Sequence, residues 1–224
     1  MYRRDFVIST FACVVELSAT SRVLGQKKAI EPDLAALVEG KGLKVFNRSL
    51  SALNDGARKG ARLSECLGDG VAYLEGVEFT DGVIEIDIRG KDVQQQSFVG
   101  VVFHGVDEKT YDAVYFRPFN FKAEDPARRL RAVQYVSHPT YAWQKLRTEH
   151  PGKYEQPVNP VPDPNGWFHA RVVVASPKVS VFVNDAKERS LVVDQLSDRK
   201  KGLVGLWVGN TSGGDFANFK VIPV

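Results

Sequence analysis

The chain has 224 residues, of which 43% are hydrophobic and 25% charged, and these values are typical of one soluble domain with a substantial core. The formal net charge is +3, and the basic residues are spread along the chain without a long basic block. This pattern argues against nucleic acid as the main partner, because nucleic-acid-binding domains gather Lys and Arg on one face.

Residues 1–25 have the pattern of an export signal peptide. Arg3 and Arg4 precede a mostly apolar run over Phe6–Val15, and small residues follow up to Gly25. The run is shorter than the roughly 20 apolar residues of a transmembrane helix, so stable membrane insertion is not expected. The arginine pair also resembles a twin-arginine signal. We therefore expect an exported protein, periplasmic or extracellular, and the alternative is a retained N-terminal helix.

Cys13 lies within the predicted signal, so Cys66 is the one cysteine that remains after its removal. An intramolecular disulfide is then ruled out, and the hydrophobic core must stabilise the domain. We expect Cys66 to be a buried, small apolar side chain rather than a nucleophile.

Residues 26–42 are expected to form an N-terminal extension, and residues 43–224 a single β-domain. The extension contains one short predicted helix, because Asp33 provides a cap and Gly40 a stop. Nearly all of the chain beyond this helix has the character of strands and turns, without an internal repeat.

Two predicted strands define the packing of the domain. Over residues 82–89, isoleucine alternates with charged residues, which predicts one buried face and one solvated face. Over residues 98–104, both faces are apolar up to His104, which predicts a strand in the middle of a sheet. Further strands are expected over residues 111–117, 131–136, 168–175, 179–183, 191–193, 203–208 and 216–222. About ten short strands without helical periods predict antiparallel sheets in a sandwich or barrel.

Six stretches of residues 70–224 carry a family resemblance: GVIEIDIRG, FVGVVFHGVDEKTYDAVYFRPFNF, RAVQYVSHPTYAWQKLR, GWFHARVVV, VSVFVND and GLVGLWVGNTSGGDFANFKV. They resemble the concanavalin A-like lectin/glucanase superfamily in its laminin-G-like branch. YFRPFNF and QYVSHPTYAWQKLR are the most distinctive, and they resemble exported bacterial proteins of the 3-keto-disaccharide hydrolase domain family. The resemblance implies an all-β, jelly-roll sandwich and a sugar-related function, without a settled mechanism.

Glu85 and Asp87 resemble the start of the catalytic motif of laminarinase-type glucanases. Both lie on one strand face, because the side-chain period of a strand is two. A retaining glycosidase needs a second carboxyl about 5–5.5 Å from the first. Arg89 and Gly90 stand where the motif's second Glu belongs, so the mechanism does not transfer directly. The alternative is that these side chains form a charged stripe exposed to solvent.

If the protein is an enzyme, the candidate acid/base residues are Glu85, Asp87, His138 and Glu155.

The stretch 119–164 contains one clear strand and is rich in Arg, Tyr, Trp, His and Pro. Such a long excursion on a β scaffold is where function usually resides. Sugars are bound by flat aromatic faces and planar polar groups. The candidate ligand-binding residues are Tyr115, Arg117, Asn120, Gln134, His138, Tyr141 and Trp143. Arg117 or Arg131 could instead hold the carboxylate of an acidic sugar. The alternative is that these residues fill the core and pin a loop.

The 4 histidines have no metal-ligand spacing, so we expect neither a zinc site nor a cofactor. A structural calcium ion is left open, because Asp107, Glu108 and Asp112 flank a predicted turn and many sandwich lectins bind one.

The leading hypothesis is an exported carbohydrate-recognising domain. One alternative is a glycoside hydrolase or lyase that acts on a polysaccharide or a modified disaccharide. A second is a structural or protein-binding laminin-G-like module, which would expose an apolar patch instead of a polar cleft. The sequence does not decide between binding and turnover, and it leaves the oligomeric state open.

Overall fold

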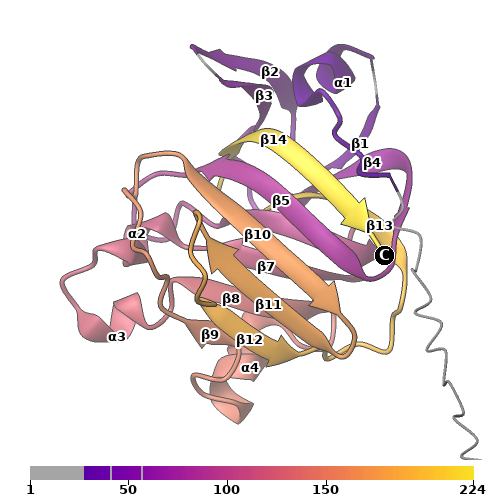
Figure 1. Ribbon diagram of the computed structural model, residues 1–224. Coiled ribbons are helices and arrows are strands. Elements are labelled where there is room, and N and C mark those ends of the chain that lie inside the picture. The colour runs from indigo at the N-terminus through magenta and orange to yellow at the C-terminus, as the bar shows by residue number, and fades with distance from the viewer. Residues whose placement is uncertain (1–27, 41, 57) are drawn as a thin grey trace, which may run out of the picture.

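A computed structural model describes residues 28–40, 42–56 and 58–224, and the predicted export signal at 1–25 lies outside the described residues. Within them, two seven-stranded sheets pack face to face as a sandwich (Figure 1). All neighbouring strands in both sheets are antiparallel. The predicted all-β, antiparallel sandwich is therefore confirmed.

The two sheets are named here after a strand of each. The β7 sheet contains, in spatial order, β1 (Leu43–Phe46), β4 (Gly70–Phe79), β13 (Gly202–Val208), β6 (Val99–Gly105), β7 (Tyr111–Phe116), β8 (Val133–His138) and β9 (Glu155–Gln156). The β5 sheet contains β12 (Leu191–Asp194), β11 (Lys178–Val183), β10 (Phe168–Ala175), β5 (Gly82–Arg89), β14 (Gly214–Pro223), β3 (Arg58–Leu63) and β2 (Leu50–Asp55).

The core lies between these sheets. On β5, Ile84, Ile86 and Ile88 are fully buried, as the alternation in the sequence predicts. Phe116 of β7 and Phe168 of β10 meet edge to face across the interface, with ring centroids 5.0 Å apart. All of β6 is buried, and β6 is the central strand of its sheet, so that prediction is also confirmed. Each large apolar side chain buried here contributes about 1.5–3 kcal/mol.

Short helices interrupt the strands. They are α1 (Leu34–Gly40), α2 (Pro118–Phe121), α3 (Pro126–Arg129) and α4 (Trp143–Glu149). The last three lie in or at the start of the excursion predicted over residues 119–164, and Figure 1 shows α2 and α3 at the left and α4 at the bottom, away from α1 at the top. Four to seven residues are too few to show a helical period, and α4, which is as long as the predicted α1, begins without a capping side chain, so these three helices were not predicted. Over the described ranges, no helix is long and apolar enough to cross a membrane.

The N-terminal extension packs onto the sandwich. Ile30 and Val221 exchange backbone hydrogen bonds of 2.8 and 2.9 Å, and Leu34 belongs to the core. The prediction for Cys66 was wrong, because its side chain is exposed. Cys66 lies in the turn between β3 and β4, beside Asn47, and not on a strand face that the sandwich covers.

Candidate functional site

The register of β6, β7, β8 and β13 builds a site on the outer face of the β7 sheet. Tyr115 lies directly opposite Gln134 on one side and Gly100 on the other, and Gly100 in turn lies opposite Trp207. Directly opposite side chains share a sheet face, so Tyr115, Gln134 and Trp207 point the same way. Phe116, the next residue along β7, points into the core. Strand parity thus brings together side chains that are far apart in the sequence.

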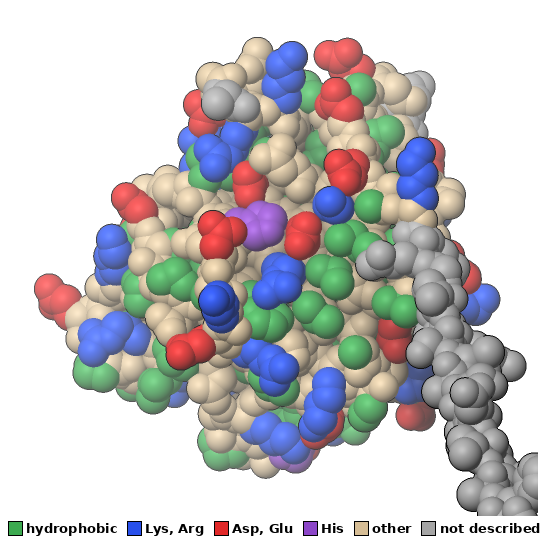
Figure 2. Space-filling model, viewed as in Figure 1, with side chains coloured by type: hydrophobic (Ala, Val, Ile, Leu, Met, Phe, Trp, Pro, Cys, Tyr) green, Lys and Arg blue, Asp and Glu red, His purple; other side chains and the backbone are tan. Residues whose placement is uncertain are grey.

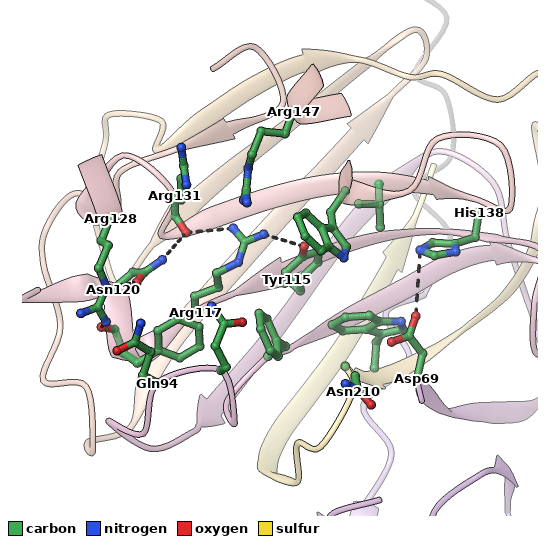
Figure 3. Close-up of a pocket in the computed structure, with 17 residues that line it drawn as sticks. Asp69, Gln94, Tyr115, Arg117, Asn120, Arg128, Arg131, His138, Arg147 and Asn210 are labelled. Carbon is green, nitrogen blue, oxygen red and sulfur yellow. Dashed lines mark hydrogen bonds and ion pairs between the residues drawn. The ribbon is translucent and has the colours of Figure 1, made fainter. Parts of the chain in front are cut away.

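A pocket of about 380 Å³ opens over this face (Figure 3). Its aromatic floor is formed by Tyr115 and Trp207, whose ring centroids are 4.7 Å apart, together with Phe98. Gly100 lets β6 and β7 approach closely beside Tyr115, because a Cβ there would lie 2.1 Å from the carbonyl oxygen of Val114. The full lining is Asp69, Gln94, Gln95, Phe98, Tyr115, Arg117, Phe119, Asn120, Arg128, Arg131, Val136, His138, Trp143, Arg147, Trp207, Gly209 and Asn210.

Arg117 organises the polar part of the floor. It follows β7, and its side chain is only 5% exposed. Its guanidinium donates to the Tyr115 hydroxyl at 2.8 Å, to the amide oxygen of Gln134, and to the Arg131 carbonyl at 2.9 Å. Asn120 donates to the same carbonyl at 3.0 Å. Burial raises the pKa of Tyr115 to about 12, so its hydroxyl stays protonated, and burial lowers the pKa of Arg117.

Glu155 of β9 is the carboxylate that pairs with the arginines around the pocket. Arg147 of α4 holds it bidentately, with bonds of 3.0 Å and 2.8 Å, and this pairing raises the pKa of Arg147. Arg117 and Arg131 each approach the same carboxylate at 3.5 Å. Arg128 of α3 donates instead to the neutral oxygens of Asn120 and Phe119. These contacts define an arginine end of the pocket.

Asp69 and His138 form the other end. Their carboxylate and imidazole lie 4.0 Å apart. The ring of Tyr111 stacks on His138 with centroids 5.0 Å apart, and its hydroxyl donates to Asp69 at 3.3 Å. Trp207 donates to that hydroxyl at 3.0 Å. Burial raises the pKa of Asp69 and lowers that of His138, although the two groups oppose these shifts in each other.

The structure brings together most of the predicted ligand-binding residues. Tyr115, Arg117, Asn120, His138 and Trp143 all line the pocket. Trp143, at the start of α4, is 42% exposed and therefore does not fill the core. Gln134 lies fully buried beneath the floor, with no partner for its amide nitrogen among the described residues. Tyr141 lines the neighbouring depression with His138 instead.

The other acid/base candidates lie elsewhere. Glu85 and Asp87 sit on the outer face of the β5 sheet, on the opposite side of the sandwich from the pocket. Figure 2 shows this face, where acidic and basic side chains surround a histidine. Asp87 is held there by Arg58, His169 and Asn218. Among the described residues, Asp69 is the one carboxylate that lines the pocket, so this pocket does not contain the pair of carboxylates that a two-carboxylate glycosidase uses.

The structure separates Asp107 and Asp112, two of the carboxylates considered for a calcium ion. Asp107 is exposed and accepts hydrogen bonds from the backbone of its own turn. Asp112 is fully buried, and its carboxylate is held by Arg199 at 2.9 Å and Ser197 at 2.6 Å. The carboxylates therefore do not converge, and the part of the chain that the structure describes contains no group of three or more potential metal ligands.

Sequence reasoning missed several lining residues. Trp207 reaches the pocket through the pairing of β13 with β6, which places it opposite Gly100 beside Tyr115, and the sequence alone does not reveal that pairing. Arg128 and Arg147 lie in helices too short to predict, and Asp69 precedes β4, a strand that was not predicted.

No protein-family model matches the chain, and no curated protein matches its sequence. Solved structures do match. A carbohydrate-binding module, CBM66, from Bacillus subtilis is 16% identical with a TM-score of 0.55, over 80% of this chain and 95% of that one. A protein of unknown function with a galectin-like fold, also from Bacillus subtilis, is 12% identical with a TM-score of 0.58, over 88% and 96%. The metal-free exoplasmic/lumenal domain of VIP36 is 10% identical with a TM-score of 0.52, over 82% and 85%. These likenesses show a lectin-like β-sandwich fold.

Proposed function

We propose that this protein binds carbohydrate in the pocket on the outer face of the β7 sheet. The main observation behind this proposal is that aromatic rings and planar polar groups line a pocket of about 380 Å³, a volume within the range of ligand pockets. Sugars present apolar C–H faces to rings and hydroxyls to polar forks. The likeness in fold to a carbohydrate-binding module supports the same function.

Each part of the pocket has a role in this proposal. Trp143 offers an exposed ring at the rim, and the Arg147 guanidinium lies 4.8 Å from the centroid of that ring and steadies it. Trp207 and Tyr115 form the floor beneath the sugar. Asn120 and Asn210 add amide groups, which pair with sugar hydroxyls as donor and acceptor.

The proposed cellular location rests on residues 1–25, whose basic and apolar pattern supports export to the periplasm or the extracellular space. The twin-arginine pathway is the proposed route. Membership of the laminin-G-like branch, near the 3-keto-disaccharide hydrolase domains, is proposed on the sequence stretches of residues 70–224. Mass spectrometry of the secreted protein would test export, which predicts a mature N-terminus close to residue 26.

A second candidate function is turnover of the bound sugar by a hydrolase or lyase. The observation in its favour is the Asp69–His138 pair, which lies in the same pocket. Burial lowers the pKa of His138, which favours the neutral imidazole that can accept a proton from a ligand. His138→Ala would then abolish turnover while leaving sugar binding. The third alternative, a protein-binding module, would need an apolar patch, and this face is instead a pocket of mixed polar and aromatic lining.

Glycan-array screening followed by calorimetry tests the proposed function. Trp143→Ala removes the exposed platform, and Trp167→Ala is the matched control, because Trp167 packs between Arg58 and Arg89 outside the pocket. We expect Trp143→Ala to weaken binding of the best glycan at least about tenfold, and Trp167→Ala to leave it unchanged. Equal affinities in the wild type and both variants would refute the site.

A further inference from the structure

The two ends of the pocket differ in charge. Of the residues that the structure describes, four arginines and one carboxylate, Asp69, line it. Figure 3 shows Arg117, Arg128, Arg131 and Arg147 toward one end and Asp69 with His138 at the other. The arginines come from different elements, since Arg117 follows β7, Arg128 lies in α3 and Arg147 in α4. Folding therefore gathers cations from separate segments around one space.

The protein neutralises only part of this charge. Glu155 carries one negative charge, and Arg117, Arg131 and Arg147 all share it. Arg128 forms no ion pair within the described ranges, because its acceptors are an amide and a carbonyl oxygen. The arginine end thus keeps excess positive charge. Like charges held close together repel one another, and a bound anion relieves that repulsion.

Part of the guanidinium surface is also free to contact a ligand. Arg131 has a side chain that is 43% exposed, and its contact with Glu155 is a single approach at 3.5 Å. Arg128 has a third nitrogen, Nη1, without a partner among the described residues. A guanidinium is a planar fork that pairs with carboxylate and sulfate groups through two parallel hydrogen bonds.

We propose that the carbohydrate bound here is anionic, and that its carboxylate or sulfate group lies at the arginine end. This inference rests on the proposed function and names its ligand class. Asp69, at the other end, repels a second anion and so sets the direction in which the sugar lies. Trp143 stands at the rim and belongs to both roles, because its ring contacts the sugar and its neighbour Arg147 faces the charge.

Matched ligands separate the contribution of charge from that of the sugar ring. Oligogalacturonate is compared with its methyl ester, and a sulfated galactan oligosaccharide with its unsulfated form. We expect the charged member of at least one pair to bind about tenfold tighter or more, the effect of one charge-assisted hydrogen bond. We also expect added NaCl to reduce that preference, since salt screens exposed charges. The pair that shows the preference identifies the anion as carboxylate or sulfate.

Arginine variants test the position of the charge. Arg128→Gln and Arg131→Gln remove charge from the pocket, and the backbone carbonyl of Arg131 remains to accept from Arg117 and Asn120. Arg129→Gln is the control, because Arg129 donates to the carbonyls of Ala123 and Glu124 and does not line the pocket. We expect each pocket variant to lose about tenfold in affinity for the charged ligand and little for the neutral one. Arg129→Gln should match the wild type.

Three outcomes contradict the proposal in distinguishable ways. If neutral glycans bind as tightly as charged ones and Trp143→Ala abolishes binding, the anionic inference fails while the proposed function stands. If charged glycans bind preferentially but Arg128→Gln and Arg131→Gln leave that preference unchanged, the anion does not lie at the arginine end. If none of the glycans binds, both the inference and the proposed function fail.

Discussion

The Tyr115 hydroxyl donates a 2.7 Å hydrogen bond to the amide oxygen of Gln134 across the β7–β8 pair. Arg117 contacts both groups, so the three side chains form one buried polar unit under the pocket. This unit anchors the floor of the proposed binding site and holds the guanidinium of Arg117 in place.

We predict that Tyr115→Phe destabilises the protein by about 1–2 kcal/mol, because it removes the buried hydroxyl that donates to Gln134 and accepts from Arg117. Affinity for the sugar should fall as well, since Arg117 loses one of its acceptors. Urea unfolding and calorimetry measure the two effects. Tyr154→Phe is the control, because the hydroxyl of Tyr154 forms no hydrogen bond within the described residues and should cost little.

Glu155→Gln should lower the free energy of unfolding by about 3 kcal/mol, because it leaves three arginines without their shared carboxylate. The value is at the low end for a buried pair, since Arg131 and Arg147 are partly exposed. Glu149 pairs with Lys145 on the surface of α4, so Glu149→Gln should cost about 0.5 kcal/mol or less. Equal losses in the two variants by urea unfolding would contradict the role assigned to Glu155.

The Asp87–His169 contact, 2.9 Å long, makes stability depend on pH. The bond to Asp87 raises the pKa of His169 above 6.5. Burial alone would raise the pKa of Asp87, but hydrogen bonds from His169, Asn218 and Arg58 outweigh it and leave the pKa below 3.8. The contribution of His169 to the free energy of unfolding is complete below pH 6.5, and it is lost as pH rises through the pKa of His169 in the folded state. The aspartate contribution is complete above pH 3.8 and is lost on acidification.

We therefore predict that the difference in unfolding free energy between the wild type and His169→Gln is largest between pH 3.8 and 6.5, the ordinary pKa values of the two groups. The difference should shrink toward pH 9. In an Asp87→Asn background, His169→Gln should show no such dependence. A difference that stays constant from pH 5 to pH 9 would show that the pair does not titrate as described.

The same substitution should destabilise the protein strongly at Asp112 and hardly at all at Asp107. Asp112→Asn leaves Arg199 and Ser197 around a neutral amide in the core, which should cost about 3 kcal/mol or more. Asp107→Asn changes an exposed turn and should have little effect on folding.

Since Asp107 and Asp112 do not converge on one point, we expect EDTA to leave the melting temperature unchanged. A fall in melting temperature with EDTA that calcium restores would point to a metal site.

Strand parity accounts for what could be predicted of the fold. The alternation in β5 and the two apolar faces of β6 follow directly from burial, and both predictions are confirmed. The strands β1–β4 were missed, because charged and small residues such as Arg58, Lys59 and Gly60 hide the period. Those strands lie toward the sheet edges or are partly exposed, where side-chain burial dictates less of the sequence.

The candidate site was predictable in its residue types but not in its assembly. Polar and aromatic density marked Tyr115, Arg117 and Trp143, yet only the register of β7 with β8 shows that their faces coincide with that of His138. The charge of the pocket depends on short helices, whose sequences carry no period. Glu155 is a residue type that often serves as a catalytic acid, but here its carboxylate pairs with arginines as their counter-ion. This role is visible only in the three-dimensional structure.

Tryptophan fluorescence tests the central claim, that carbohydrate binds in this pocket, most directly. The chain has 3 tryptophans, and Trp143 and Trp207 line the pocket while Trp167 lies outside it. A Trp167→Phe variant therefore reports emission from the pocket alone. We predict that titration with the best glycan from the array gives a saturable change in emission, with the dissociation constant found by calorimetry. Calorimetric binding without any change in the emission of this variant would place the sugar elsewhere.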